Sequence, residues 1–313
     1  MPSAAAVGLL GATLVAALFL PGVAGMPVAL AVPLSLAVGL GGWPLAVGIG
    51  TVGAAVLAYS DGVLSALAGL VGPILAGLGC GLGLRRQKRA GLTVLATAVG
   101  LAAGLLLQWP RLGSAWVHWQ QDWRAGVEVT LEFYRQSGLL AAMAAQGVGA
   151  EQFRQNLEVL ALLVGRLYPT VLVWEIAAAA TAVYFFSRWA IKRWRPVAAV
   201  PPFSHWQLPW PWVWGLIGGL AIYLLGDWRG IQGAVTLGLN LVVAYLPMLA
   251  LYGLAVLIYL YRHIALPAWV KAVGFFPLVL YLPLGLAVLV CVGLFDPWLN
   301  FRRLAPQEGG GNR

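Results

Sequence analysis

The chain has 313 residues, of which 61% are hydrophobic and only 9% are charged, and its formal net charge is +9. A soluble globular domain carries about 25% charged residues, because its surface must be wetted. This composition excludes an ordinary soluble domain and favours a protein whose solvent is the lipid bilayer. Backbone groups in hydrocarbon must be bonded within the chain, and the apolar runs show no alternating polarity. We therefore expect an all-α, polytopic helical membrane protein.

The apolar runs were divided into spans by length, because a helix needs about 20 residues to cross about 30 Å of hydrocarbon. This division predicts about nine transmembrane helices, and eight to ten fit the pattern. In chain order the runs are 4–24, 26–41, 44–59, 63–84, 91–108, 161–187, 210–226, 231–261 and 272–295. We group residues 1–195 as a six-span membrane core, 196–303 as C-terminal membrane helices, and 304–313 as a disordered tail.

Eight of the 19 basic residues are gathered in two clusters that each end an apolar run. The first consists of Arg85, Arg86, Lys88 and Arg89, and the second of Arg188, Lys192, Arg193 and Arg195. Positive residues concentrate on the cytoplasmic side of membrane proteins. Two predicted spans separate the clusters, so both can face the cytoplasm, which also places the N-terminus there. We expect a multi-pass protein of the bacterial inner membrane, with the lipid bilayer and not nucleic acid as its partner.

The sidedness of the C-terminal third depends on the run 231–261, which has Pro247 near its middle. One long kinked helix would put Arg262 and Lys271 inside and leave Arg302 and Arg303 outside. Two short helices would reverse both assignments. The sequence leaves this alternative open.

The segment 110–158 lies outside the cytoplasm in this topology, and we expect it to be amphipathic. One helical face carries apolar residues at six positions: Trp116, Trp119, Trp123, Val127, Leu131 and Tyr134. Such a pattern is typical of a helix that lies in the headgroup plane. We interpret it as an interfacial anchor, or alternatively as a lid over a binding pocket.

Ionisable residues at membrane depth are costly, so they are functional candidates by default. Glu175 has no charged neighbour within eight residues. The topology places Asp61, Gln108 and Trp109 on the same outer side. We therefore hypothesise an outward-opening, substrate-binding pocket lined by these residues and Trp174. The alternative is that Glu175 is protonated, or bonded to a helix backbone or to a tyrosine.

Small residues recur at four-residue spacing, which lets helices approach closely in lipid. Gly8, Ala12 and Ala16 form such a stripe in the first predicted span, and Gly77/Gly81 and Gly79/Gly83 are GxxxG pairs. Two interpretations are open. The stripe in the first span could dock a partner membrane subunit, or these small residues could pack helices within the chain.

Sequence motifs for catalysis or cofactor binding are absent. The chain contains no GxxxxGK[ST], no HExxH and no GxSxG at a strand–helix turn. Cys80 and Cys291 are far apart in sequence and have no clustered histidine. We therefore expect no enzyme activity, no cofactor and no metal. Asp227 and Asp296 sit at span ends, where a carboxylate reaches water, and we interpret both as structural.

The C-terminal part carries a family resemblance. Phe203-Ser-His-Trp-Gln-Leu-Pro209 precedes a Trp-rich span, Asn240 lies in the next apolar run, and the chain closes with a Gly-x-x-Asp-x-Trp-x-x-Phe-Arg motif that contains Asp296, Trp298, Phe301 and Arg302. This pattern resembles the YybS-like family of uncharacterised bacterial membrane proteins.

The six N-terminal spans of that family are similar to the substrate-binding S subunits of energy-coupling-factor transporters. Those subunits bind a vitamin from outside and dock on a transmembrane subunit through small residues of their first helix. The resemblance implies a transport-related protein, namely a substrate-binding or accessory subunit without an ATPase of its own. The alternative is a non-transporting membrane scaffold in envelope or developmental assembly.

Overall fold

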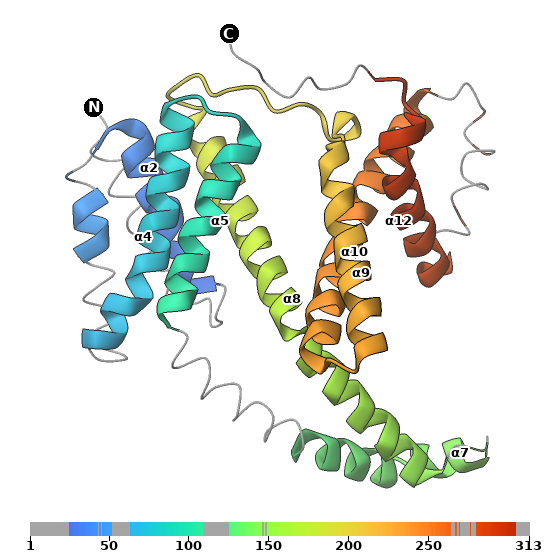
Figure 1. Ribbon diagram of the computed structural model, residues 1–313. Helices are drawn as coiled ribbons and strands as arrows, with labels where there is room; N and C mark the ends of the chain where they lie inside the picture. The colour runs from blue at the N-terminus through green and yellow to red at the C-terminus, as the bar shows by residue number, and fades with distance from the viewer. Residues whose placement is uncertain are drawn as a thin grey trace. The chain divides into compact units, whose positions relative to one another are not determined.

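The structure is a computed structural model that describes residues 25–42, 44, 46–51, 63–108, 125–145, 147, 149–263, 267, 269, 276 and 280–304. The regular elements in these residues are all helical (Figure 1). The chain divides into two units: unit 1 comprises Met1–Gly165 and Leu172–Ala199, and unit 2 comprises Arg166–Val171 and Val200–Arg313. The predicted span 4–24 lies outside the described residues, and only 44 and 46–51 of the predicted helix 44–59 lie within them.

Three helices of unit 1 match the sequence-based spans. They are α2 (Gly25–Leu40), α4 (Val63–Arg85) and α5 (Ala90–Leu107), and each begins and ends within one residue of the expected range. The agreement follows from the sequence, because apolar runs of this kind end where glycines or basic residues begin. The first basic cluster forms the turn between α4 and α5.

Glycines on α4 bring it into close contact with α2. A Cβ atom added to Gly77 would lie 2.6 Å from the Cβ of Leu34, and one added to Gly81 would lie 2.7 Å from the backbone oxygen of Ser35. Distances this short leave no room for a side chain. The Gly77/Gly81 pair therefore packs helices within the chain.

The second glycine pair of α4 contacts α5. A Cβ at Gly79 would lie 3.1 Å from the backbone of Ala96, and one at Gly83 would lie 2.6 Å from the Thr93 side chain. The two pairs are offset by two residues, which is about 200° around a helix. α4 consequently lies between α2 and α5, and both GxxxG pairs serve intramolecular packing.

Helix α8 (Ala150–Ile191) is longer than the expected span 161–187. It has 42 residues, which corresponds to about 63 Å of helix, or roughly twice the thickness of the hydrocarbon. Its first turns belong to the amphipathic segment, so the helix continues from that segment into the membrane without a break. Pro169 lies inside it.

Residues 125–145 form a helical hairpin with the start of α8. A helix covers 125–136, and α7 (Leu139–Ala145) follows it. The Tyr134 ring lies 5.0 Å from that of Phe153, and Arg154 forms a 2.8 Å ion pair with Glu128. Two apolar residues of the helix are buried, Val127 and Leu131.

The hairpin covers part of the predicted apolar face, at Val127, Leu131 and Tyr134, and the position of this segment in the headgroup plane stays a prediction. These residues pack within the hairpin, because an amphipathic face is equally well covered by a second helix as by lipid. The tryptophans of the predicted face, at positions 116, 119 and 123, lie outside the described residues.

Unit 2 contains η1 (Phe203–His205), η2 (Trp210–Trp212), α9 (Val213–Arg229), α10 (Gln232–His263) and α12 (Leu282–Leu299). α10 is one continuous helix of 32 residues with Pro247 inside it, which resolves the alternative for 231–261. α12 covers the second half of the expected span 272–295 and extends past its end.

The ends of α10 and α12 both lie against η1. The Tyr259 ring contacts the His205 ring at 5.6 Å, and Arg302 Nη1 donates to the backbone oxygen of Ser204 at 2.7 Å. Arg262 is therefore at the same end of unit 2 as Arg302. The expectation that a single long helix over 231–261 puts Arg262 and Arg302 on opposite sides of the membrane is wrong. It rests on counting membrane crossings, whereas the contacts with η1 place both residues at one end of unit 2.

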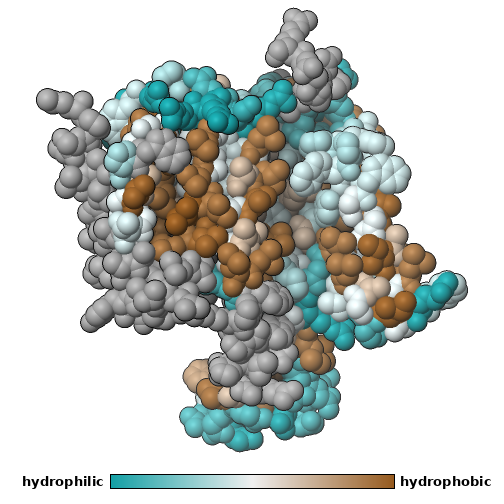
Figure 2. All heavy atoms as spheres, turned by 60° about the vertical axis from the view of Figure 1, so that its left-hand side comes forward, coloured by the Kyte–Doolittle hydropathy of each residue, from teal (hydrophilic) through white to brown (hydrophobic). Residues whose placement is uncertain are grey.

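Apolar side chains cover much of the described surface. Four helices are long and apolar enough to cross a membrane among the described residues: α5, α8, α10 and α12. Figure 2 shows hydrophobic side chains across the middle of unit 1 and hydrophilic ones at the end that carries the α4–α5 turn. Exposed apolar residues on α4 and α5 include Leu75, Leu92, Leu95, Val99 and Leu106. A soluble surface rarely exposes so large an apolar patch, so this surface suits lipid.

We predict that the C-terminus faces the cytosol. The η1 end of unit 2 carries Arg262, Arg302 and Arg303, whereas the opposite end, at the α9–α10 turn, carries Asp227 and Arg229. Positive residues favour the cytoplasmic side. Alkaline phosphatase fused after residue 304 should be inactive, and the same enzyme fused after residue 229 should be active. High activity of the fusion at 304 would contradict this sidedness.

Candidate functional site

A cluster of neutral polar side chains, which we name the polar centre, lies between four helices of unit 1. Ser35 of α2, Cys80 of α4, Thr97 of α5 and Ser187 of α8 are all fully buried. The hydroxyls of Ser35 and Ser187 are hydrogen-bonded to each other. The Cys80 thiol lies against the hydroxyls of Ser187, Thr97 and Ser35. Four helices thus each contribute one small polar group to the same point.

This polar centre holds helices together. Thr97 Oγ1 also donates to the backbone oxygen of Thr93 at 2.7 Å, and Ser35 Oγ to that of Val32 at 2.7 Å. Hydroxyls that bond across helices add to association in lipid. No charged residue belongs to the cluster, and no group of metal-ligating side chains occurs among the described residues.

The two basic clusters lie at the same end of unit 1 (Figure 1). Arg195 Nη1 donates to the backbone oxygen of Gly39 at 3.1 Å. A Cβ on Gly39 would meet Ile191 at 2.5 Å and the backbone oxygen of Gly81 at 3.7 Å. Arg85 is one helical turn beyond Gly81. The expected placement of both clusters on one side is therefore confirmed for unit 1, and its assignment to the cytoplasm stays a prediction.

The side-chain amide of Asn240 in α10 forms hydrogen bonds with residues of α8 on both sides of Pro169. Its Oδ1 accepts hydrogen bonds from the Thr170 backbone N–H at 3.1 Å and from Thr170 Oγ1 at 2.8 Å. Its Nδ2 donates to the backbone oxygens of Arg166 at 2.7 Å and Thr236 at 2.8 Å. In a regular helix the Thr170 N–H and the Arg166 oxygen would bond to each other.

The Asn240 amide replaces the backbone hydrogen bond that is missing between Thr170 and Arg166 of α8. Pro169 has no N–H, and its ring disturbs the hydrogen bonds of the preceding turn. Backbone groups freed in this way at membrane depth must find another partner. The side-chain amide supplies a donor and an acceptor together, and it is buried. The sequence marks Asn240 only as part of a family pattern, because its partners in α8 are 70 and 74 positions away.

We predict that Asn240→Ala lowers stability by about 1–2 kcal/mol, because it leaves buried backbone groups of α8 without their partner. The melting temperature of the purified protein in detergent should fall by a few degrees. Asn156→Ala, on the exposed part of α8, is the matched control and should change little.

Replacing Pro169 by Ala tests the cause of this loss. If the amide compensates for the proline, Asn240→Ala should cost less stability in a Pro169→Ala background. Equal losses in the two backgrounds would show that Asn240 stabilises unit 2 by other contacts.

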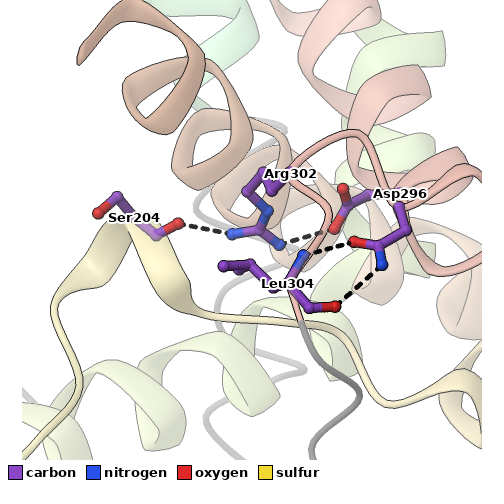
Figure 3. A network of polar contacts seen from close by, with 5 residues as sticks. Ser204, Asp296, Arg302 and Leu304 are labelled. Carbon is purple, nitrogen blue, oxygen red and sulfur yellow. Dashed lines mark hydrogen bonds and ion pairs between the residues drawn. The ribbon is translucent and has the colours of Figure 1, made fainter. Parts of the chain in front are cut away.

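Arg302 forms a buried ion pair with Asp296 of α12 and a hydrogen bond with η1 (Figure 3). Arg302 Nη2 donates to Asp296 Oδ2 at 2.6 Å, and the two side chains are 0% and 8% exposed. The chain turns back at Asn300, which has φ +43° and whose side chain bonds both backbone groups of Leu304 at 2.9 and 3.1 Å. Arg302 Nη1 meets the Ser204 oxygen described above.

The interpretation of Asp296 as a carboxylate that reaches water is therefore wrong. Arg302 covers it, because the turn at Asn300 folds the chain end back over α12. Of the family-motif residues, Asp296 and Arg302 are brought together, whereas Trp298 and Phe301 are exposed. Asp296 Oδ1 and Arg302 Nε are buried without a hydrogen-bond partner.

We predict that breaking this pair is more harmful than removing it. Asp296→Asn leaves the buried Arg302 charge unpaired and should destabilise the protein by about 3–5 kcal/mol, measured as a loss of folded material after extraction. The double variant Asp296→Leu with Arg302→Met should recover much of this loss. Glu132→Gln, which breaks the exposed pair with Arg135, should cost at most about 1 kcal/mol.

The residues of the predicted outward pocket are described only in part. Gln108 is half-buried and its Nε2 donates to the Gly104 oxygen at 3.3 Å. Trp174 is half-buried, and Glu175 is exposed. Asp61 and Trp109 lie outside the described residues, as do the docking residues Gly8, Ala12 and Ala16. The pocket and the docking stripe stay predictions.

Gln108 and Glu175 are at matched depth along their helices. Gln108 is 11 residues from Thr97 on α5, and Glu175 is 12 residues from Ser187 on α8. These separations correspond to about 17 and about 18 Å of helical rise from the same polar centre. Both side chains are thus displaced by similar amounts from the polar centre, away from the basic end of unit 1.

These features define a helical membrane protein with several apolar helices and polar contacts buried between them. Residues 9–297 match the family described as predicted membrane protein (DUF2232), and the chain belongs to that family. No curated protein and no solved structure matches the chain.

Proposed function

We propose that this protein is a non-catalytic, transport-related subunit of the bacterial inner membrane, which binds a small substrate from outside. It would depend on another membrane subunit for energy. We favour this function over a membrane scaffold because it gives a role to Glu175, a carboxylate within an apolar helix.

Glu175 carries the proposal. A carboxylate within an apolar helix is costly unless it serves a pathway or a ligand. Glu175 is exposed on α8, and no ion pair engages it among the described residues. Gln108 at similar depth adds an amide, and Trp174 adds an aromatic surface. In the proposed site these three side chains would form the mixed polar and aromatic lining that small-molecule sites use.

We predict that Glu175→Gln abolishes or strongly weakens ligand stabilisation. The purified protein is screened by thermal melting against water-soluble vitamins and other small cationic or amide-bearing compounds. A ligand that raises the melting temperature of the wild type should lose at least about tenfold in affinity with the variant, as expected for one charge-assisted contact.

Glu151→Gln is the matched control, because it changes an exposed carboxylate on the same helix, outside the apolar stretch. It should leave ligand stabilisation unchanged. If Glu175→Gln binds every stabilising compound as tightly as the wild type does, the site is not at Glu175 and the proposal fails.

The need for a second subunit is tested separately. Gly8→Leu or Ala12→Leu should weaken co-purification of a coupling membrane subunit, because a bulky side chain prevents close helix approach. A wild-type protein that stays alone after mild extraction would remove the docking part of the proposal.

A further inference from the structure

The basic end of unit 1 is a surface of unbalanced positive charge. It is formed by the α4–α5 turn and the C-terminal end of α8, which meet the end of α2 around Gly39. Neither segment 83–92 nor segment 186–199 contains Asp or Glu. Eight basic residues are therefore collected here without an acidic residue in either segment.

Two of these basic side chains form hydrogen bonds with backbone oxygens of the described residues. Arg195 donates to the Gly39 oxygen, and Arg188 donates to the Ala198 oxygen. Such contacts satisfy carbonyls near helix ends, where positive charge is favourable. The other basic residues are exposed, and none is paired with a described carboxylate: Arg85, Arg86, Lys88, Arg89, Lys192 and Arg193.

Aromatic residues indicate the depth of this surface. Trp189 and Trp194 are 62% and 50% exposed, and the Arg193 guanidinium lies 4.3 Å from the Trp189 ring centroid. Exposed tryptophans concentrate at the level of the lipid headgroups. Arg85 ends an apolar helix and Arg89 directly precedes another, which places these basic residues at the same level as the tryptophans.

We propose that the basic end of unit 1 binds the phosphodiester headgroups of anionic phospholipids. Arg85, Arg86, Lys88 and Arg89 would hold them on one side of Gly39, and Lys192 and Arg193 on the other. Arginine suits this task because its planar fork matches two phosphate oxygens, and basic sites between helices are known to take such headgroups. A soluble acidic protein is the competing partner, but the tryptophans place this surface within the headgroup layer. The inference is independent of the proposed transport function.

The test measures which lipids stay bound to the purified protein. The full chain is reconstituted with equal amounts of phosphatidylglycerol and phosphatidylcholine and re-extracted, and the retained lipids are counted by native mass spectrometry. The wild type should retain phosphatidylglycerol preferentially. Arg86→Gln with Lys88→Gln, and Lys192→Gln with Arg193→Gln, should each lower the retained ratio by on the order of tenfold, as the loss of two such charges implies.

Arg135→Gln with Arg229→Gln is the control, because both arginines are exposed and neither belongs to the basic end. This variant should keep the wild-type ratio. If a double variant fails to fold, as judged by melting in zwitterionic detergent, the single variants Arg86→Gln and Lys192→Gln decide the question with smaller changes in the same direction.

Three results would overturn the proposal. The first is equal retention of the two lipids by the wild type, and the second is an equal loss in the control. The third is displacement of phosphatidylglycerol by inorganic phosphate, which would mean that free phosphate is the ligand. If the substitutions spare lipid retention but abolish binding of a soluble acidic protein, the surface is a protein interface.

Discussion

The absence of water in hydrocarbon is the constraint on which the described structure depends. Every backbone N–H and C=O at membrane depth needs a partner in the protein. The helices meet this requirement along most of their length. Pro169 is the exception in α8, and there Asn240 of α10 completes the hydrogen bonding. An apolar residue at 240 would have suited the surroundings better but could not have replaced the missing donor and acceptor.

Close helix packing follows from the same constraint, since lipid offers no hydrophobic force to press helices together. Unit 1 obtains it from glycines on two sides of α4 and from the hydroxyls and thiol at its centre. These two devices are linked. The Ser35 and Cys80 side chains can meet only because Gly77 and Gly81 let α2 and α4 approach within backbone contact.

Much of the fold could be predicted from the sequence where the apolar runs have clear ends. The basic residues at 85–89 mark the limits of α4 and α5, and the structure places the ends there. The start of α8 could not be predicted, because residues 150–160 are amphipathic and continue into the apolar run without a breaking residue. The face of 125–136 was recognised, but its partner was not, because the pattern of apolar residues is the same for lipid and for a second helix.

Individual side-chain contacts could not be predicted, because they depend on backbone conformation and on the packing of other helices. The Asp296–Arg302 pair requires the backbone to reverse at Asn300 with a positive φ, which six residues of sequence do not specify. Thr170 and Arg166, the residues that Asn240 bonds across the helix interface, lie in α8. Glu175 was identified because a charge in an apolar run is visible without any contact.

The spacing of the α4 glycines also limits how the chain length can vary. Each residue added to a helix turns everything beyond it by about 100° and advances it by about 1.5 Å. One residue inserted between Gly77 and Gly79 would turn Gly79, Gly81 and Gly83 by about 100° relative to Gly77, so it would break both the contact with α2 and the contact with α5. We therefore expect insertions and deletions to be tolerated in the turn at 86–89 and not within α4. The glycine positions of α4 determine where α2 and α5 make their close contacts along it.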